Sequence, residues 1–253
     1  MKDETIGILG AIKDEISWIF PLLKEQRQEK IGNRKYYIGK LNNKNIVASY
    51  SGYGKVASSL TATTLITKHN VDLIIFVGVA GALKKLVSIG DIVIGKNFYQ
   101  HDVSASPTFK KFMLPFQKTP FIKGNDKLIK KAKAGVEKFL TNPNFKNLFS
   151  QNVLNDFNIK HPKLFIEDIT SSDKAVLKKD EKLSLAKDLP SAFAVDMEGG
   201  AISQVCEDFS TPFVIIRVIF DDINSSDNLN LKIFLTDLTS VYFKEIITYL
   251  LEP

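Results

Sequence analysis

The chain has 253 residues, of which 44% are hydrophobic and 25% are charged. This length and composition are those of a globular protein with a substantial core, and they exclude a chain that is mostly disordered. The formal net charge is +6, but no nucleic-acid-binding motif accompanies the lysines, so we interpret them as solvated surface and expect no nucleic-acid partner.

Apolar runs of strand length recur along the chain, and helical patterns lie between them. Several of these runs are apolar without alternation, which is typical of strands covered on both faces. The strand–helix alternation predicts a three-layer α/β domain with a mixed, mainly parallel sheet. The predicted strands are residues 6–9, 45–50, 73–77, 91–94, 163–166, 192–195 and 213–218, and the predicted helices are residues 13–25, 55–68, 126–139, 198–209 and 231–251.

The whole chain, residues 1–253, is expected to form a single domain. Its least regular part is the stretch 104–162, which we interpret as an insertion or lid region because prolines interrupt it repeatedly. A basic helical pattern lies inside this stretch, and we interpret the lysine-rich residues 123–146 as a solvated helix surface. The prolines are Pro107, Pro115, Pro120, Pro143 and Pro162.

Five residues that could bind a ligand, take part in catalysis or form a turn lie shortly after predicted strands. They are Glu15, Gly52, Val79, Met197 and Asp221. In parallel sheets, sites form beyond the carboxyl ends of the strands, so we expect these positions to lie together. Each one alone also fits a simpler interpretation, either a strand–helix turn or an acid that stabilises a helix N-terminus.

An arginine lies inside the strongly apolar segment VIIRVIFDDI, residues 214–223. Burying Arg217 is costly unless a carboxylate pairs with it, and we expect Glu15 or Glu198 to be that partner. Buried acid–arginine groups at strand ends favour a functional site over a plain surface.

Eight sequence blocks resemble, in the same order, those of the 5′-methylthioadenosine/S-adenosylhomocysteine nucleosidases, a family in the nucleoside phosphorylase superfamily. The resemblance covers most of the chain except about residues 106–160. It implies the nucleoside phosphorylase fold. The blocks are IGILGAIKDEI (6–16), SGYGKVASS (51–59), VGVAGAL (77–83), IGDIVI (89–94), QHDVSA (100–105), SSDKAV (171–176), FAVDMEGGAI (193–202) and PFVIIRVIFDD (212–222).

The resemblance implies hydrolysis of the N-glycosidic bond of a purine nucleoside. The implied substrates are 5′-methylthioadenosine, S-adenosylhomocysteine or both, and the products are adenine and the 5-thioribose. Glu15 matches the acid that activates water, and Asp221 matches the general acid that protonates purine N7. Arg217 matches an arginine near the attacking water. Protonating the departing base and orienting water at the anomeric carbon are the two tasks that such a cleavage requires.

Further positions match the family's substrate contacts. Met197 and Glu198 match the ribose-binding pair, Tyr53 lies at the wall of the 5′-substituent pocket, and Val176 lies in the adenine-binding segment. Three positions depart from the family: Phe220 replaces a serine, Ala175 replaces an aromatic residue that stacks on the base, and Val79 replaces a serine found in some relatives. We hypothesise that Phe220 supplies the aromatic surface that is missing at Ala175.

Three other functions stay open from the sequence. A nucleoside phosphorylase would need a phosphate cradle, and Lys13 and Lys55 do not form a convincing one. A nucleoside-binding protein without turnover is supported by Phe220, although binding alone does not require both acids. A nucleosidase with another base or 5′ group, such as a futalosine-type hydrolase, would differ mainly around Tyr53 and the irregular stretch after Ser104.

The remaining expectations concern partners and surroundings. The family resemblance implies a homodimer whose partner chain closes the 5′ pocket. No cofactor is expected because water is the nucleophile, and no metal is expected because the histidines are scattered. Cys206 cannot form an intrachain disulfide, no stretch approaches the ~20 apolar residues of a membrane span, and no signal peptide is recognised, so a cytoplasmic protein is expected.

Overall fold

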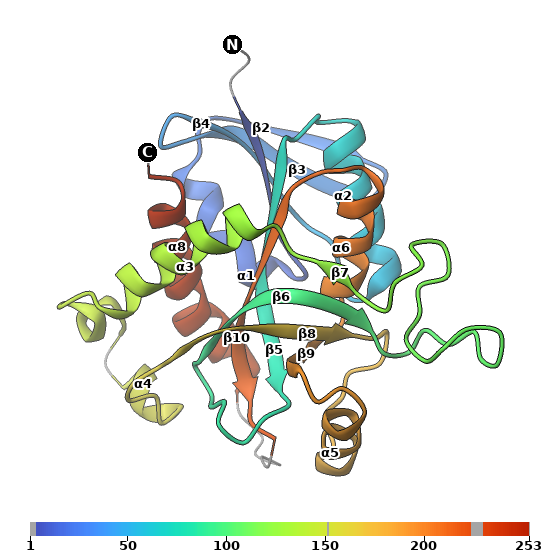
Figure 1. The fold of residues 1–253 in the computed structure, drawn as a ribbon. Coiled ribbons are helices and arrows are strands. Elements are labelled where there is room, and N and C mark those ends of the chain that lie inside the picture. The colour runs from blue at the N-terminus through green and yellow to red at the C-terminus, as the bar shows by residue number, and fades with distance from the viewer. Residues whose placement is uncertain (1–3, 151, 224–229, 253) are drawn as a thin grey trace.

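A mixed ten-stranded sheet forms the centre of the computed structural model, which describes residues 4–150, 152–223 and 230–252. Figure 1 shows the sheet twisting strongly between helices on both sides. The strands are β1 (Thr5–Gly10), β2 (Lys24–Ile31), β3 (Arg34–Leu41), β4 (Lys44–Tyr50), β5 (Leu73–Ala82), β6 (Ile92–Gln100), β7 (Ile122–Lys123), β8 (Leu164–Ser171), β9 (Ala192–Asp196) and β10 (Phe213–Asp221).

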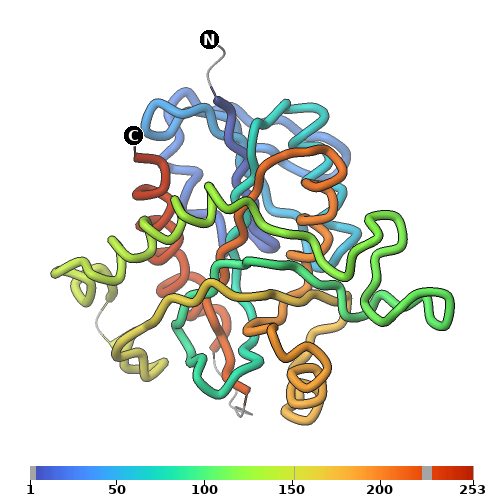
Figure 2. The backbone as a smooth tube through the Cα atoms, in the orientation of Figure 1, coloured from blue at the N-terminus to red at the C-terminus, as the bar shows by residue number. Residues whose placement is uncertain are grey.

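The sheet closes on itself at one end. Strand β5 pairs in parallel with β1 and β10, and β10 also pairs with β6 in antiparallel orientation. The ring is completed by β8 and β9, which link β6 back to β5. At the other end, β4, β3 and β2 continue the sheet outward from β1. The backbone tube in Figure 2 shows the same curl of the chain around β5.

Helices cover the sheet on two faces and produce three layers, which confirms the predicted fold class. One face packs against α1, α3 and α8, and the other packs against α2 and α6 (Figure 1). Helix α8 continues a π-helical segment, η3, and a short α7. The helices are α1 (Lys13–Ile16), α2 (Lys55–Thr67), α3 (Asp126–Leu140), α4 (Val153–Asp156), α5 (Lys179–Asp188), α6 (Gly199–Asp208), α7 (Leu231–Ile233), η3 (Phe234–Thr239) and α8 (Ser240–Leu250).

The predicted helix over residues 13–25 is wrong beyond its first turn. Helix α1 ends at Ile16, a 3₁₀ segment η1 (Ser17–Leu22) follows, and β2 begins at Lys24. Pro21 cannot donate a backbone hydrogen bond, so it opposes a continued α-helix. Strands β2 and β3 escaped prediction because β2 is solvent-exposed along nearly all of its length and shows no apolar alternation.

Strand β5 is longer than predicted. The glycine-containing segment after Val77 continues as strand to Ala82, although its sequence favoured a turn. The far half of β5 is held on both sides, because Gly81 pairs with Val195 of β9 and with Asp221 of β10. Val79 therefore lies inside a strand and not after one. Neighbouring strands, which local sequence does not reveal, override the turn preference of glycine.

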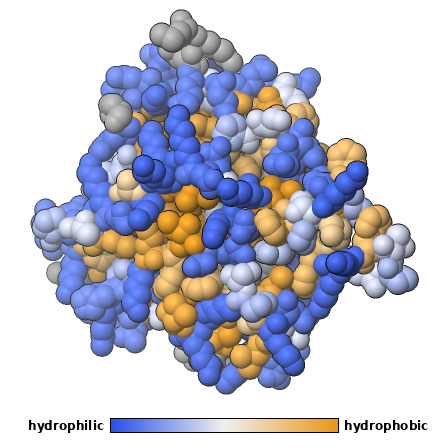
Figure 3. Space-filling model, in the orientation of Figure 1, coloured by the Kyte–Doolittle hydropathy of each residue, from blue (hydrophilic) through white to orange (hydrophobic). Residues whose placement is uncertain are grey.

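The stretch 104–162 contains both an irregular loop and a helix that is part of the core. The loop extends from the body of the molecule on the right of Figure 2. Helix α3 follows it, buries residues such as Val136 and Phe139 against α8, and turns its lysines to solvent. Hydrophilic side chains cover much of this face in Figure 3. Within the described residues, no helix is both long and apolar enough to span a bilayer.

Candidate active site

One cavity of about 200 Å³ collects nearly all of the residues that the sequence singled out. It lies where β5, β9 and β10 end or approach one another, beside the glycine turns that follow β1 and β4. Arg217 lies behind the wall and does not line it. The predicted site residues that line the cavity are Glu15, Tyr53, Val79, Ala175, Val176, Met197, Glu198, Phe220 and Asp221.

Glu15 is buried and held by backbone amides. Its Oε2 accepts hydrogen bonds from Ala11 (2.7 Å) and Ile12 (3.1 Å), and its Oε1 accepts one from Val79 (3.0 Å). Burial raises the pKa of Glu15 above its ordinary value, while Arg217 and the three amides oppose that rise. The carboxyl group is therefore fixed in orientation and more basic than a solvated glutamate.

Arg217 is fully buried and pairs chiefly with Asp196, which the sequence did not single out, while the expected partner Glu198 is a more distant second partner. Its Nε donates to Asp196 Oδ2 at 2.8 Å, and Nη2 lies 2.6 Å from the same oxygen. Glu198 is a secondary partner, with 3.7 Å between Nη2 and Oε2, and Glu15 acts on Arg217 only through its charge. Asp196 takes this place because β9 pairs with β5, which carries β10 on its other edge.

Asp196 also organises the start of α6. Its carboxylate accepts from the amides of Glu198 and Gly199, and from the hydroxyl of Ser171. The same side chain thus neutralises Arg217 and satisfies helix amides that would otherwise lack partners. Because Glu198 directly precedes this helix, its position at the cavity is fixed by the same contacts.

Glu198 bridges two segments that are far apart in sequence. Its Oε1 accepts a hydrogen bond of 2.9 Å from the amide of Gly54, in the turn before α2. Gly54 has a φ of 88°, a conformation that favours glycine. Burial, followed by the charge of Asp196, raises the pKa of Glu198 to about 7. This carboxyl group therefore titrates near neutral pH.

Asp221 ends β10 and meets a buried lysine. Its Oδ2 lies 2.6 Å from Nζ of Lys182, and Nζ also donates to the backbone oxygen of Asp222 at 2.8 Å. Oδ1 of Asp221 is buried beside Gly81, and the backbone amide of Ala82 also donates to this carboxyl group. Burial raises the pKa of Asp221, and Lys182 opposes this rise through its hydrogen bond and its charge.

The remaining walls of the cavity are mainly apolar. Phe220 lines the cavity, and its ring also packs edge-on against Phe234, with centroids 5.1 Å apart. Tyr53 is 62% exposed and Leu177 is 67% exposed, so both lie at the open side. Leu231 adds another apolar side chain that the sequence did not single out.

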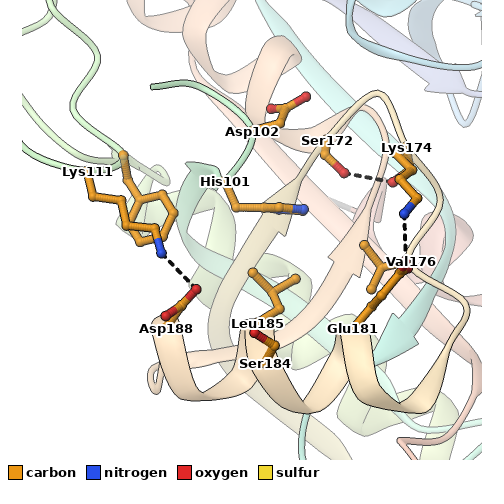
Figure 4. Close-up of a pocket in the computed structure, with 11 residues that line it drawn as sticks. His101, Asp102, Lys111, Ser172, Lys174, Val176, Glu181, Ser184, Leu185 and Asp188 are labelled. Carbon is orange, nitrogen blue, oxygen red and sulfur yellow. Dashed lines mark hydrogen bonds and ion pairs between the residues drawn. The ribbon is translucent and has the colours of Figure 1, made fainter. Parts of the chain in front are cut away.

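A second, larger cavity of about 380 Å³ shares Val176 with the first. Figure 4 shows it between α5 and the protruding loop, with Lys111 pointing to Asp188 and Lys174 to Glu181. Because these acids are paired with lysines and partly exposed, this cavity lacks the buried acids of the first. Among the described residues, no cluster of His, Cys, Asp and Glu side chains is arranged to hold a metal ion.

This chain is similar to known proteins over nearly all of its length. Residues 5–247 match the family described as the phosphorylase superfamily. The chain belongs to the phosphorylase superfamily. The 5′-methylthioadenosine/S-adenosylhomocysteine nucleosidase of Staphylococcus haemolyticus is 32% identical over 231 residues, covering 91% of this chain and 92% of that protein. The corresponding protein of Staphylococcus epidermidis is 30% identical over 247 residues, covering 98% and 99%.

Solved structures of the superfamily share the fold. A methylthioadenosine/S-adenosylhomocysteine nucleosidase from Colwellia psychrerythraea in complex with adenine has a TM-score of 0.83 at 25% identity, covering 98% of this chain and 95% of that one. Futalosine hydrolase of Helicobacter pylori has a TM-score of 0.80 at 29% identity, covering 97% of each chain. This chain is therefore an enzyme of the nucleoside phosphorylase and nucleosidase superfamily.

Several residues in the cavity wall or directly behind it were not predicted as site residues. Asp196 carried a signal, because it stands next to Met197 and Glu198 at a strand end. Lys182 carried none, since it lies in a lysine-rich segment that reads as solvated surface. Gly78 and Gly81 are functional through absence of a side chain: a Cβ at Gly78 would lie 2.1 Å from Arg217 Nη1, and one at Gly81 would lie 2.6 Å from Asp221 Oδ1.

Proposed function

We propose that this protein hydrolyses the N-glycosidic bond of a purine nucleoside, with 5′-methylthioadenosine and S-adenosylhomocysteine as the favoured substrates. The observation that carries the proposal is the presence of the buried Glu15 and Glu198 and the half-buried Asp221 on one cavity, each in a different environment. Carboxyl groups whose surroundings differ in this way can take different roles in acid–base catalysis.

Glu15 is suited to hold the attacking water, and Arg217 acts on Glu15 from behind the wall through its charge. Both approach Gly78: a Cβ there would lie 2.7 Å from Glu15 Oε1 and 2.1 Å from Arg217 Nη1. The charge of Arg217 favours the ionised form of Glu15, which is the form that accepts a proton. Glu15 accepts a proton from this water as the water oxygen adds to the anomeric carbon.

Asp221 is suited to protonate the leaving base. Its carboxyl group lies on the cavity wall, and burial favours the neutral form that can donate. The proton passes to N7 of the purine as the bond between C1′ and N9 breaks. Gly78 lies beside Glu15, and Gly81 lies beside Asp221. These glycines are three residues apart on β5, so the two acids approach the strand at points about 10 Å apart.

The rest of the cavity fits a nucleoside with an apolar 5′ group. Glu198 can accept hydrogen bonds from both hydroxyls of a ribose, and Met197 lies next to it. Tyr53, Leu177 and Leu231 give the open side an apolar character that suits a thioether substituent. The similarity to nucleosidases that carry methylthioadenosine in their names supports this choice.

Hydrolysis is favoured over phosphorolysis by the charges on the wall. No lysine, arginine or histidine lines the cavity within the described residues, whereas Glu15, Asp196, Glu198 and Asp221 do. Phosphate binding ordinarily uses cationic side chains or helix amides, and here the amides near Glu15 already donate to it. We therefore assign water as the nucleophile.

The proposal is tested by incubating the protein with a panel of nucleosides and measuring free base by chromatography, with and without phosphate. We expect adenine from methylthioadenosine or S-adenosylhomocysteine without any requirement for phosphate. The panel includes adenosine, inosine and futalosine, because the similarity to futalosine hydrolase makes another base or 5′ group the competing assignment. A requirement for phosphate, or no base from any nucleoside, would overturn the proposal.

The acid assignment is tested with Asp221→Asn. An amide cannot supply the proton, so we expect kcat to fall by roughly 10²–10⁴-fold. The matched control is Asp188→Asn, which makes the same chemical change at an exposed residue paired with Lys111. Native turnover in Asp221→Asn would show that another group protonates the base.

A further inference from the structure

The proposed hydrolysis leaves one buried charged group without a role. Lys182 is 0% exposed, although it lies on α5, a helix whose other buried residue is Leu185. Its ammonium group contacts Asp221 Oδ2 and the backbone oxygen of Asp222. Burying an ammonium group is costly, so this placement beside a cavity acid differs from an ordinary surface ion pair.

The two oxygens of Asp221 are made unequal by this contact. Oδ2 receives a hydrogen bond from an ammonium group, which has donors and no acceptor. The other oxygen, Oδ1, is buried beside Gly81 of β5, and the backbone amide of Ala82 also donates to the carboxyl group. Contacts from α5 and β5 therefore hold the carboxyl group of Asp221 in one orientation.

We propose that Lys182 is a positioning residue for the glycosidic cleavage, which orients the carboxyl group of Asp221 that carries the transferable proton. This inference rests on the proposed function. In the reaction, the bond between hydrogen and a carboxyl oxygen of Asp221 breaks and a bond from hydrogen to N7 forms, while the electron pair of the C1′–N9 bond moves to the base. Lys182 keeps its three protons throughout and touches no reacting atom.

The charged groups that act on the carboxyl group of Asp221 predict how its titration depends on Lys182. From α5, the ammonium of Lys182 favours the ionised carboxylate, and from β10 and its end the charge of Asp222 opposes ionisation. Replacing Lys182 by a neutral residue removes the favourable charge, so the pKa of Asp221 rises. The protonated, competent form then persists to higher pH.

The test compares Lys182→Met, Lys182→Arg and the matched control Lys187→Met, an exposed lysine of the same helix. For Lys182→Met we expect kcat to fall at least about tenfold, a part of the 10²–10⁴ that loss of the acid costs, with KM nearly unchanged. Its alkaline limb of kcat against pH should move upward by about one unit or more. Lys182→Arg should keep the native limb, and Lys187→Met should behave as native.

A direct titration separates this inference from the proposed function. The carboxyl carbon of Asp221 is followed by ¹³C NMR without nucleoside, with Asp221→Asn used to assign the signal. A higher pKa in Lys182→Met than in the native protein supports the inference even if no nucleoside is turned over. Equal pKa values in the two proteins, or the same shifted alkaline limb in Lys182→Arg as in Lys182→Met, would overturn it. Thermal unfolding identifies variants that have not folded.

Discussion

At the scale of single residues, the cavity separates its acids by what surrounds each one. Glu15 is held by three backbone amides, Glu198 by one amide and the charge of Arg217 against a neighbouring acid, and Asp221 by a buried ammonium group. Burial raises the pKa of all three, but the opposing contacts differ in kind. One chemical group can thus serve as base, ligand and acid within a single cavity.

Glu198 should give substrate binding a pH dependence near neutrality. The ionised carboxylate makes stronger hydrogen bonds to ribose hydroxyls than the protonated acid. With a pKa of about 7, only about a tenth of Glu198 is ionised at pH 6, so KM should rise about tenfold from pH 8 to pH 6. The measurement is KM against pH for the native protein and for Glu198→Gln, whose KM should be higher and flat over this range.

The same titration should appear in stability without any substrate. The folded pKa of Glu198 lies above its ordinary value of 4.5, so the folded state binds more protons than the unfolded state between the two values. Stability from this residue therefore falls as pH rises from about 4.5 to above 7. Glu198→Gln should gain thermal stability relative to native at pH 8 and lose that advantage below pH 4.5. An advantage independent of pH would contradict the assignment.

At the scale of elements, strand β5 supplies the close approach that the acids need. Gly78 allows Arg217 and Glu15 to meet beside the strand, and Gly81 allows Asp221 to lie against it. The sequence predicted a turn here, because glycine-rich segments after apolar runs commonly form turns. The glycines instead leave two positions of the strand without side chains, one beside Glu15 and Arg217 and one beside Asp221.

Gly78→Ala should therefore disable the site from within a strand. The new methyl group would displace Arg217 and Glu15, so we expect destabilisation of about 1–3 kcal/mol and a large loss of kcat. The matched control is Gly7→Ala in β1, where a Cβ would come no closer than 3.3 Å to a neighbouring atom. Urea unfolding and base release measure the two effects. Equal effects from both substitutions would show that the approach at Gly78 is unimportant.

Helices with a clear apolar period were predicted nearly to the residue, whereas the start of the chain was not. Helices α2, α3 and α6 agree with their predicted ranges within a residue or two at each end. The segment 13–25 has apolar spacing that also fits a helix, but Pro21 and the pairing of β2 with β3 decide against it. An exposed strand held mainly by backbone pairing leaves little trace in hydrophobic periodicity.

At the scale of the whole molecule, closure of the sheet brings the separate acids together. Asp221 reaches the cavity because β10 pairs with both β5 and β6, and Glu198 reaches it because β9 pairs with β5. The network of Lys55, Asp102 and Asp173 then ties α2 to the segments that follow β6 and β8.

A homodimer remains a prediction, and one exposed surface indicates where to test it. Helix α2 exposes Val56 (72%) and Leu60 (53%), which line a groove shared with α6. Contiguous apolar surface of this kind is typical of contacts between proteins. We expect the native chain to sediment as a dimer of its 28.3 kDa subunit and Leu60→Asp to shift it towards monomer. Leu183→Asp, at an exposed leucine of α5, is the control. A native monomer at micromolar concentration would contradict the prediction.

The sequence by itself determined the fold class, the main helices and many of the residues that line the cavity, because apolar periodicity and ordered motifs are local properties of the chain. The tertiary structure alone decided that Asp196 pairs with Arg217, that Lys182 meets Asp221, and that two glycines in β5 make room for them. These contacts join residues between 21 and 140 positions apart through strand register and helix packing. The sequence does not show which carboxylate pairs with which cation, because only the folded geometry decides which charges lie together in a low-dielectric environment.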